Sequence, residues 1–329
     1  PTYSDLLKNS WQGGDSGMAV ALVGGRPILK KVVPGSPAYK AGLRVGYQIV
    51  SVNGESFANL KKTVESSGGF KNVIPFYLEK SVENRWYGSL GESVELVAKS
   101  GAFGTSKRYA FKLRTYEGLM SEQLGNFGTM PMEIETRILE GEVAYLRFDI
   151  WFPGLMVAMR NFVRSLGDDV SGLVIDVRGN PGGIGLMATG LAGMLVDEEF
   201  RMGTMRMRSG FLNFNVFPQK GAFLGPVAVL IDGSSISTSE IFAASMQETG
   251  RARVFGSKSP GAALPSVFKK LPNRYYLQMA IADYETDKKR RIEGVGVLPD
   301  EAVALSPSKL RRGEDSVVVA ARKWILRQN

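Results

Sequence analysis

Short hydrophobic runs broken by glycine and proline dominate the first hundred residues. Residues 32–33 and 49–52 are rich in valine and isoleucine, the composition of a β-strand. Between them, Ser36 and Pro37 form a helix-start signal and Gly42 a stop signal, which predicts one short helix. The pattern therefore predicts a β-rich domain with tight turns in this part of the chain.

From Val143 onward the pattern changes to longer apolar runs separated by amphipathic segments. Residues 143–148 have the composition of a strand, residues 153–166 carry apolar side chains at helical spacing, and residues 173–177 are almost continuously apolar. A strand, an amphipathic helix and a buried strand in this order predict a βαβ unit with a parallel sheet. The same alternation returns in residues 184–196, 226–231, 239–249 and 252–255, and residues 315–326 form a last amphipathic helix.

Length and charge narrow the class of protein. The 329 residues suffice for two domains at roughly 150 residues each, and 44 % apolar with 22 % charged residues is ordinary for a folded globular chain. The net charge is +9, but the basic residues are scattered. The densest run, residues 288–291, lies between acidic residues and without aromatic neighbours, so we expect no nucleic-acid partner. No stretch is long and apolar enough to predict a transmembrane segment.

Two residue types are missing altogether. The chain has no cysteine, which excludes disulfides, thiolate zinc sites and cysteine nucleophiles, and it has no histidine, which excludes an imidazole base or ligand. A Ser-His-Asp mechanism is therefore impossible, and neither a metal nor an organic cofactor is expected.

A serine-rich turn, residues 232–240, lies between a predicted buried strand and a predicted helix start. Unpaired N–H groups at a helix N-terminus stabilise negative charge that develops nearby, so a serine hydroxyl there suits nucleophilic chemistry. The spacing of Ser237 and Glu240 also fits a capping box, in which both side chains only satisfy the end of the helix. Taken alone, this segment favours the capping interpretation.

A second turn changes that balance. Residues 178–183, with the sequence RGNPGG, follow a predicted buried strand at the end where ligands bind in open α/β sheets. Adjacent glycines let a backbone N–H approach a substrate oxygen closely. By itself this is a glycine-proline turn, but together with the serine turn it indicates a catalytic site.

The β-rich region resembles a PDZ domain. Residues 35–54 match the bacterial PDZ pattern, with Tyr47 where the family usually has aspartate. The resemblance implies a loop whose N–H groups bind the C-terminal carboxylate of a peptide, with β-strand addition beside it. A β-domain with a purely structural role is the alternative. The implied carboxylate-binding residues are Gly17, Met18, Ala19 and Val20.

The second half resembles the C-terminal processing, or tail-specific, serine peptidases, a family related to the core of the tricorn protease. Three blocks carry the resemblance in the family order: residues 175–183, 235–243 and 294–300. The implied fold class is mixed, α+β or α/β, with a PDZ-like β-rich domain followed by a crotonase-like spiral of ββα units. The implied domains are an N-terminal segment 1–16, a PDZ-like domain 17–115 with an insertion at 57–90, a connection 116–140, a peptidase core 141–306, and a C-terminal helix 307–329 that packs on the core.

The same resemblance implies roles for individual residues. Ser237 is the expected nucleophile, and the N–H groups of Thr238 and of the Gly182-Gly183 turn are the expected oxyanion-hole donors. Glu240 is expected to support the start of the helix, and Glu248 is expected to be a second supporting residue.

The chain departs from the family at the base. The family's lysine and the glutamine four residues later fall on Ala262 and Ser266. A serine hydroxyl needs a positioned base, and an alanine methyl group cannot act as one. Lys258, four residues earlier, and Lys269 or Lys270 on the following strand are candidate replacements.

Glu293 is a further candidate base. It resembles an acidic residue of the tricorn-like branch, although that branch also needs the histidine that this chain lacks. We favour the interpretation that Glu293 instead pairs with the basic run at residues 288–291.

Two functions follow. The first is a serine endopeptidase that cleaves unfolded proteins or C-terminal tails through an acyl-enzyme on Ser237. The second is a catalytically degenerate core that acts as a peptide-binding or scaffold module. The expected partners are unfolded proteins or peptide C-termini. The family usually works outside the cytoplasm, so the resemblance implies an exported protein, periplasmic or extracellular, and we expect that a leader is absent from a chain that begins at Pro1.

Overall fold

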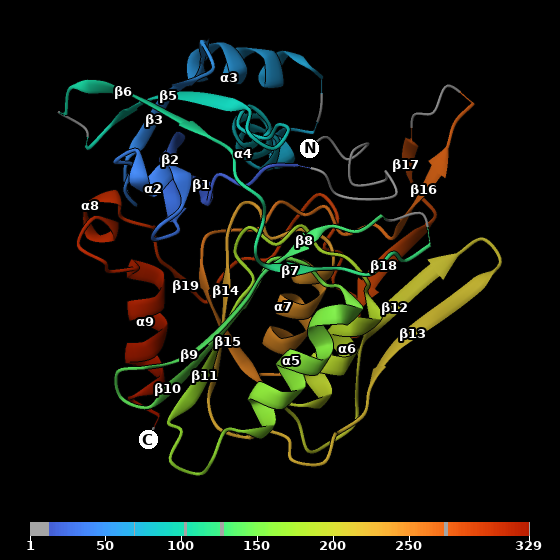
Figure 1. Ribbon diagram of the computed structural model, residues 1–329. Helices are drawn as coiled ribbons and strands as arrows, with labels where there is room; N and C mark the ends of the chain where they lie inside the picture. The colour runs from blue at the N-terminus through green and yellow to red at the C-terminus, as the bar shows by residue number, and fades with distance from the viewer. Residues whose placement is uncertain (1–12, 69, 102–103, 126–127, 273–275, 329) are drawn as a thin grey trace. The chain divides into compact units, whose positions relative to one another are not determined.

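The computed structural model describes residues 13–68, 70–101, 104–125, 128–272 and 276–328. These form two compact units (Figure 1). The first comprises the chain up to residue 131 together with residues 304–316, and the second comprises residues 132–303 with the C-terminal residues from 317 on. Among the described residues, no helix has the length and apolar character needed to span a membrane.

The first unit is built on a six-stranded antiparallel sheet. Its strand order is β1-β2-β3-β5-β6, with β4 paired to β3, so β1 lies at an edge. The strands are β1 (Met18–Val23), β2 (Arg26–Val32), β3 (Gln48–Val52), β4 (Glu55–Ser56), β5 (Ser93–Lys99) and β6 (Ser106–Lys112). The helices are α2 (Pro37–Lys40), α3 (Phe57–Ser66), η1 (Lys71–Val73), α4 (Ile74–Asn84) and, from the later segment, α8 (Pro307–Leu310).

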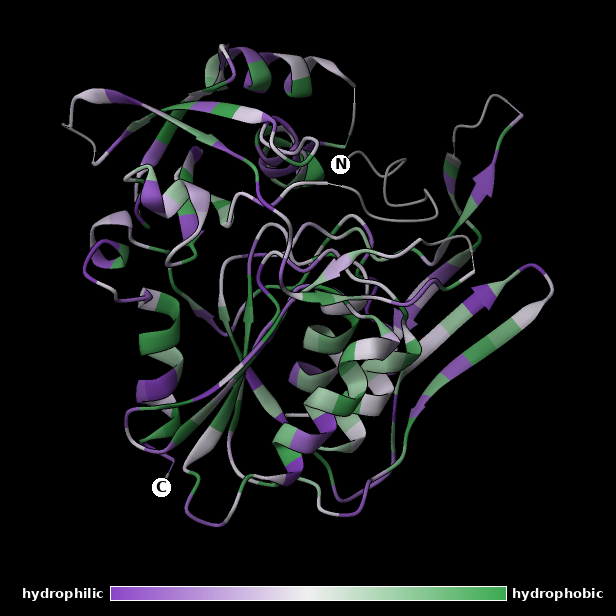
Figure 2. Cartoon of the chain, in the orientation of Figure 1, coloured by the Kyte–Doolittle hydropathy of each residue, from purple (hydrophilic) through white to green (hydrophobic). Residues whose placement is uncertain are grey.

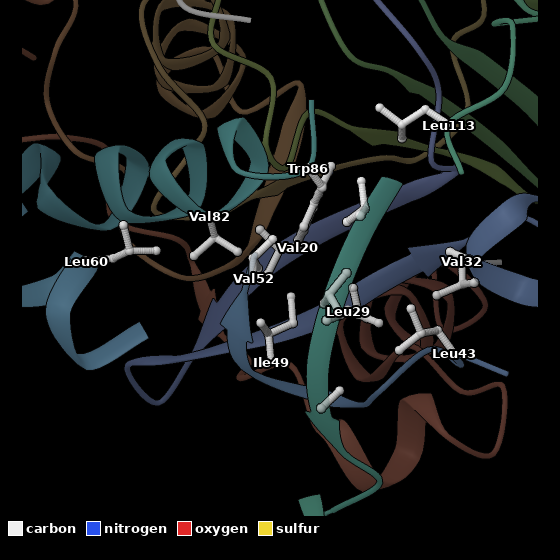
Figure 3. Close-up of a cluster of buried hydrophobic side chains, with 14 residues drawn as sticks. Val20, Leu29, Val32, Leu43, Ile49, Val52, Leu60, Val82, Trp86 and Leu113 are labelled. Carbon is white, nitrogen blue, oxygen red and sulfur yellow. The ribbon is translucent and has the colours of Figure 1, made fainter. Parts of the chain in front are cut away.

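The short helix predicted after Ser36 is confirmed as α2. The Ser36 hydroxyl accepts a hydrogen bond from the N–H of Tyr39 at 3.2 Å, and Pro37 occupies the first turn, as the start signal requires. The core of this unit gathers side chains from β1, β2, β3 and β5 together with α3 and α4 (Figure 3). Residues 57–90 supply α3, η1 and α4, and Leu60 of α3 and Val82 of α4 belong to the core.

The second unit contains the predicted parallel sheet. The strand order is β19-β15-β14-β11-β10-β9, in which only β9 is antiparallel to its neighbour. Every residue of β11 and β14 is buried, which explains their almost continuously apolar sequences. The strands are β9 (Ile134–Leu139), β10 (Val143–Phe148), β11 (Gly172–Asp176), β14 (Val227–Ile231), β15 (Ala252–Gly256) and β19 (Glu301–Ala302).

Helices lie on both faces of this sheet. On one side are α5 (Pro153–Arg164), α6 (Leu186–Gly193) and α7 (Thr238–Glu248), and on the other is α9 (Ser316–Ile325), whose Trp324 packs against Phe255 of β15 (Figure 1). Hydrophobic residues dominate the central strands and the inner helices (Figure 2). The predicted alternation of strands and helices and the predicted C-terminal amphipathic helix are thus confirmed.

The described residues also form three smaller sheets. In the second unit, β12 (Phe200–Met207), β13 (Gly210–Val216) and β18 (Ala282–Thr286) form a three-stranded sheet, and β16 (Ser266–Lys270) with β17 (Tyr276–Ala280) forms a hairpin. The short strands β7 (Leu119–Met120) and β8 (Pro131–Met132) pair in the segment that leads into the second unit.

Candidate active site

Two turns meet where the parallel strands β11 and β14 end. The N–H of Gly179 donates to the carboxylate of Asp232 at 2.9 Å, and the N–H of Ile236 donates to the carbonyl oxygen of Asn180 at 3.0 Å. Carboxyl ends of adjacent parallel strands share one edge of the sheet, so the order of the strands brings the RGNPGG turn against the serine turn.

Ser237 occupies a strained position at the start of α7. Its φ is 56° and its ψ is −117°, outside the regions that a residue with a Cβ ordinarily adopts. Its N–H donates to the carbonyl oxygen of Ala262 at 3.1 Å and to a carboxylate oxygen of Glu240 at 3.2 Å, and these bonds hold the conformation. A strained backbone conformation persists only where the surrounding structure holds it, and such residues are concentrated at functional sites. The side chain is half-buried.

Gly182 lies directly against Ser237. A Cβ at position 182 would lie 2.7 Å from the Cβ of Ser237 and 3.1 Å from the nitrogen of Thr238, and the φ of Gly182 is +96°. Gly183 has a φ of +142°, and its carbonyl oxygen accepts the Thr238 hydroxyl at 3.1 Å. The structure therefore brings together the four residues expected to form the nucleophile and the oxyanion hole.

The backbone N–H groups of these residues differ in what they already bind. The N–H of Gly182 donates to the side-chain oxygen of Asn180 at 2.9 Å. Within the described residues, the N–H groups of Gly183 and Thr238 donate to no acceptor of the protein. Gly183 and Thr238 are thus the donors that remain for a substrate oxygen, and Gly183 is exposed.

Asn180 and Trp151 position the glycine turn. The Asn180 amide is completely buried and donates to the carbonyl oxygen of Phe148 at 3.1 Å. Trp151 pairs with the turn through its backbone, since its N–H donates to the carbonyl oxygen of Gly182 at 3.0 Å, and its indole N–H donates to Ser239 at 2.9 Å. Asn180 was part of the recognised motif without a role of its own, whereas nothing in the local pattern around Trp151 indicated this contact.

Glu240 fastens the segment after β15 to the start of α7. Besides the N–H of Ser237, its carboxylate accepts the N–H of Ala262 at 2.8 Å, the N–H of Gly261 at 2.6 Å and the hydroxyl of Ser259 at 2.6 Å. Burial raises the pKa of Glu240, and these hydrogen bonds oppose the shift. Its oxygens already accept four hydrogen bonds, so Glu240 acts on Ser237 as a positioning residue.

The expected base positions carry no base in contact with Ser237. Ala262 is half-buried, its side chain is a methyl group, and its carbonyl oxygen accepts the Ser237 N–H. Ser266 is exposed on β16, where its hydroxyl accepts the side-chain amide of Gln278 at 2.8 Å. Lys258 is exposed. Across the described part of the chain, no lysine amine or carboxylate forms a hydrogen bond with the Ser237 hydroxyl.

Glu293 holds the same segment from the other side. One of its carboxylate oxygens accepts the N–H groups of Ala263 at 2.7 Å and of Leu264 at 3.1 Å. Among the described ion pairs, Lys289 of the basic run pairs with Glu285, and none includes Glu293. Instead of the expected ion pair with residues 288–291, Glu293 forms hydrogen bonds with the backbone that follows Ala262.

Glu248 lies at the opposite end of α7 from Ser237. Ten residues of helix from Thr238 correspond to about 15 Å of rise. The Glu248 carboxylate accepts the hydroxyl of Thr286 at 2.8 Å. The structure therefore does not bring Glu248 to the serine, and within the described residues no cluster of three or more acidic side chains is arranged to hold a metal ion.

A buried ion pair stabilises the base of the RGNPGG turn. Asp176, at the end of β11, is fully buried and accepts a 2.6 Å bond from the Arg178 guanidinium and a 2.8 Å bond from the Tyr145 hydroxyl. Burial alone would raise the pKa of Asp176, but the charge and hydrogen bonds of Arg178 outweigh it and hold the pKa well below the usual range. The first residue of the turn is thereby fixed to the sheet.

The predicted carboxylate-binding loop lies in the first unit, before and within β1. The N–H of Gly17 donates to the Asp15 carboxylate at 2.7 Å, and the N–H of Met18 donates to the Ser16 hydroxyl at 3.3 Å. Ala19 and Val20 continue the loop into β1. The first two N–H groups of this loop therefore have acceptors within the chain.

Comparison with known proteins matches two separate parts of the chain. Residues 142–303 match peptidase family S41, and residues 28–66 match the PDZ domain. The chain is 26 % identical over 283 residues to a carboxyl-terminal-processing protease of Picosynechococcus, covering 84 % of this chain and 60 % of the relative. It is 26 % identical over 310 residues to the carboxy-terminal processing protease CtpB of Bacillus subtilis, covering 92 % and 57 %. The chain thus spans somewhat over half the length of these relatives.

Solved structures share the fold at low identity. The photosystem II D1 C-terminal processing protease matches with a TM-score of 0.57 and 20 % identity, covering 94 % of this chain and 79 % of that one. Mature CPAF matches with a TM-score of 0.63 and 14 % identity, covering 95 % and 81 %. Both resemblances inferred from sequence are confirmed: this chain carries a PDZ domain followed by a peptidase domain of family S41, and it is a relative of the carboxyl-terminal processing proteases.

Proposed function

We propose that this chain is a serine endopeptidase that cleaves unfolded proteins or C-terminal tails through an acyl-enzyme on Ser237. The observation that carries the proposal is the contact between Gly182 and Ser237, beside which the N–H groups of Gly183 and Thr238 have no acceptor within the described residues. A strained serine at a helix start, next to unpaired N–H groups, supplies the nucleophile and the oxyanion donors that acyl transfer uses.

The chemistry proceeds in two steps. The Ser237 oxygen attacks the carbonyl carbon of the scissile peptide bond, and the resulting oxyanion is bound by Gly183 and Thr238. The C–N bond then breaks, the leaving amine takes a proton, and an ester joins the substrate to Ser237. Water hydrolyses this ester, releasing a carboxylate and restoring the serine hydroxyl.

The rate is limited by the missing base. Ala262 offers no group that can accept the serine proton, so solvent water must accept it. A positioned general base contributes about 10²- to 10⁴-fold to such a reaction. We therefore propose turnover slower by about this factor than the same site would give with an amine beside Ser237.

The substrate class follows from the family. Its relatives are named for processing carboxyl termini, which supports peptide C-termini and unfolded chains as partners. The proposed carboxylate-binding loop at residues 17–20 precedes the segment 28–66 that matches the PDZ domain. The same resemblance supports a periplasmic or extracellular location.

A second candidate is a peptide-binding or scaffold module without chemistry. It is favoured by one observation: the carboxylate of Glu240, which lies next to Ser237, already accepts four hydrogen bonds, and Ala262 adds only a methyl group. An oxyanion site without its base retains some rate over water, so weak turnover alone does not exclude this candidate.

The experiment is cleavage of fluorescently labelled casein by the wild type, by Ser237→Ala and by Ser165→Ala. The last variant removes an exposed hydroxyl at the end of α5 and is the control. The proposal expects slow cleavage by the wild type and the control and none by Ser237→Ala. Cleavage that survives in Ser237→Ala overturns it, and binding of casein without any cleavage by the wild type establishes the second candidate.

A further inference from the structure

The edge strand β1 offers a place for a peptide to add to the PDZ sheet. β1 pairs with β2 on one side and is the last strand of the sheet on the other. An exposed strand edge presents alternate N–H groups to a partner, and PDZ domains bind peptides by such strand addition. In β1 these outward N–H groups are those of Val20 and Leu22, two residues apart.

Both N–H groups are already bound to helix α4. The N–H of Val20 donates to a carboxylate oxygen of Glu83 at 3.3 Å, and the N–H of Leu22 donates to Glu79 at 2.8 Å. Both glutamates are only 6 % exposed. Four residues of helix span about 6 Å and two residues of strand about 7 Å, so the two carboxylates match the two donors in spacing.

Glu83 is kept charged in this buried place. The Lys80 amine lies 2.7 Å from its second carboxylate oxygen. Burial alone would raise the pKa of Glu83, but the charges of Lys80 and Lys30 outweigh burial and lower it. The carboxylate therefore remains an acceptor at neutral pH.

The loop before β1, where the carboxylate of a peptide is expected to bind, also has its N–H groups bound by side chains of the chain. Asp15 accepts the N–H of Gly17 at 2.7 Å, and Ser16 accepts the N–H of Met18 at 3.3 Å. A bound peptide would present one terminal carboxylate at this loop and carbonyl oxygens along β1. Side chains of the chain itself thus occupy both kinds of acceptor position.

We infer that the PDZ groove of this chain is closed by its own carboxylates, and that a peptide with a free carboxyl terminus binds along β1 only after Glu79 and Glu83 leave Val20 and Leu22. The apparent affinity for such a peptide is then reduced by the small fraction of molecules in which the groove is open. The inference concerns the PDZ domain and does not depend on the chemistry at Ser237.

The test compares peptide binding by the closed and opened forms of the full chain. The probe is a fluorescein-labelled pool of decapeptides with four randomised C-terminal residues, prepared with free and with amidated carboxyl ends. All proteins carry Ser237→Ala so that the pool is not consumed. The closed form carries no further change, and the opened form adds Glu79→Ala and Glu83→Ala. The matched control adds Glu65→Ala, which removes an exposed carboxylate from α3.

The opened form should bind the free-carboxyl pool at least about tenfold more tightly than the closed form and the control, and it should not bind the amidated pool. Equal binding by the closed and opened forms, or binding that ignores amidation, overturns the inference. If circular dichroism shows that the double substitution unfolds the domain, Glu79→Ala alone is used. Hydrogen exchange at the Leu22 amide must then be faster than in the closed form, and unchanged exchange overturns the inference as well.

Discussion

The backbone N–H of Ser237 donates to the carbonyl oxygen of Ala262 at 3.1 Å, which ties the start of α7 to the segment that follows β15. The residue at which the sequence predicts the base position is therefore a direct neighbour of the proposed nucleophile. Glu240 and Glu293 hold this segment through the N–H groups of residues 261–264. The backbone at the predicted base position is thus fixed in place although residue 262 is an alanine.

Restoring an amine at this position should increase cleavage. Ala262→Lys places an ammonium group on a half-buried position next to Ser237, where partial burial lowers its pKa and favours the neutral amine. We expect casein cleavage to rise by about 10²-fold or more, since that is the usual contribution of a positioned general base. Measured rates across pH 6 to 10 should follow the titration of the new amine.

The control is Ser257→Lys, which adds the same charge to the same segment at an exposed position. It should leave the rate at the wild-type level, and Ala262→Lys combined with Ser237→Ala should be inactive. Equal rates for the two lysine variants would count against the proposed role of position 262.

A substitution at Gly182 tests whether the contact between the glycine turn and Ser237 is needed for cleavage. A Cβ there would lie 2.7 Å from the Cβ of Ser237, and the positive φ of +96° adds strain. We expect Gly182→Ala to reduce cleavage by about 10²- to 10³-fold, because the added methyl group displaces Ser237 and the Thr238 N–H, and the loss of one oxyanion donor costs about this much. The free energy of unfolding should fall by about 1–3 kcal/mol.

Gly250 provides the matched control for this substitution. It has a φ of +73° at the other end of α7, and a Cβ there would meet open space. Gly250→Ala should therefore lose stability to a similar or smaller extent but keep full activity. Full activity in a folded Gly182→Ala protein would mean that the glycine turn does not take part in the reaction.

The buried strands and the meeting of the two turns could be predicted from the sequence. The apolar runs at residues 226–231 and 252–255 are the parallel strands β14 and β15, because strands buried on both faces are apolar throughout. The RGNPGG and serine turns meet because adjacent parallel strands end at one edge. Local pattern and sheet topology were sufficient for these features.

Contacts between distant segments were not readable in this way. Trp151 holds Gly182 through its backbone, which leaves no trace in its side-chain type. Glu79 and Glu83 have the spacing of an ordinary solvated helix face, and acidic residues are rarely buried. Their burial depends on the placement of α4 along β1, which no short stretch of sequence encodes.

The free energy of unfolding of the second unit should depend on pH through Asp149, which follows β10. Its carboxylate accepts the N–H of Glu133 at 2.8 Å, and burial together with the charge of Glu133 raises its pKa from 3.8 to about 7, partly opposed by Arg147. In the unfolded chain Asp149 ionises near the ordinary value, so between these two pH values the unfolded state releases a proton that the folded state keeps. The contribution of Asp149 to folding therefore declines as the pH rises from about 4 to about 7.

Asp149→Asn removes the titration but keeps an oxygen that can accept the Glu133 N–H. We expect its free energy of unfolding, measured in urea, to gain on the wild type steadily from pH 4.5 to pH 7 and to keep that gain at pH 8. Asp168→Asn, which removes an exposed carboxylate of the same unit, should show no such trend. A difference between Asp149→Asn and the wild type that stays flat across this range would mean that Asp149 is ionised in the folded protein at pH 4.5, and that the surroundings formed by Glu133 and the end of β10 do not disfavour its charge.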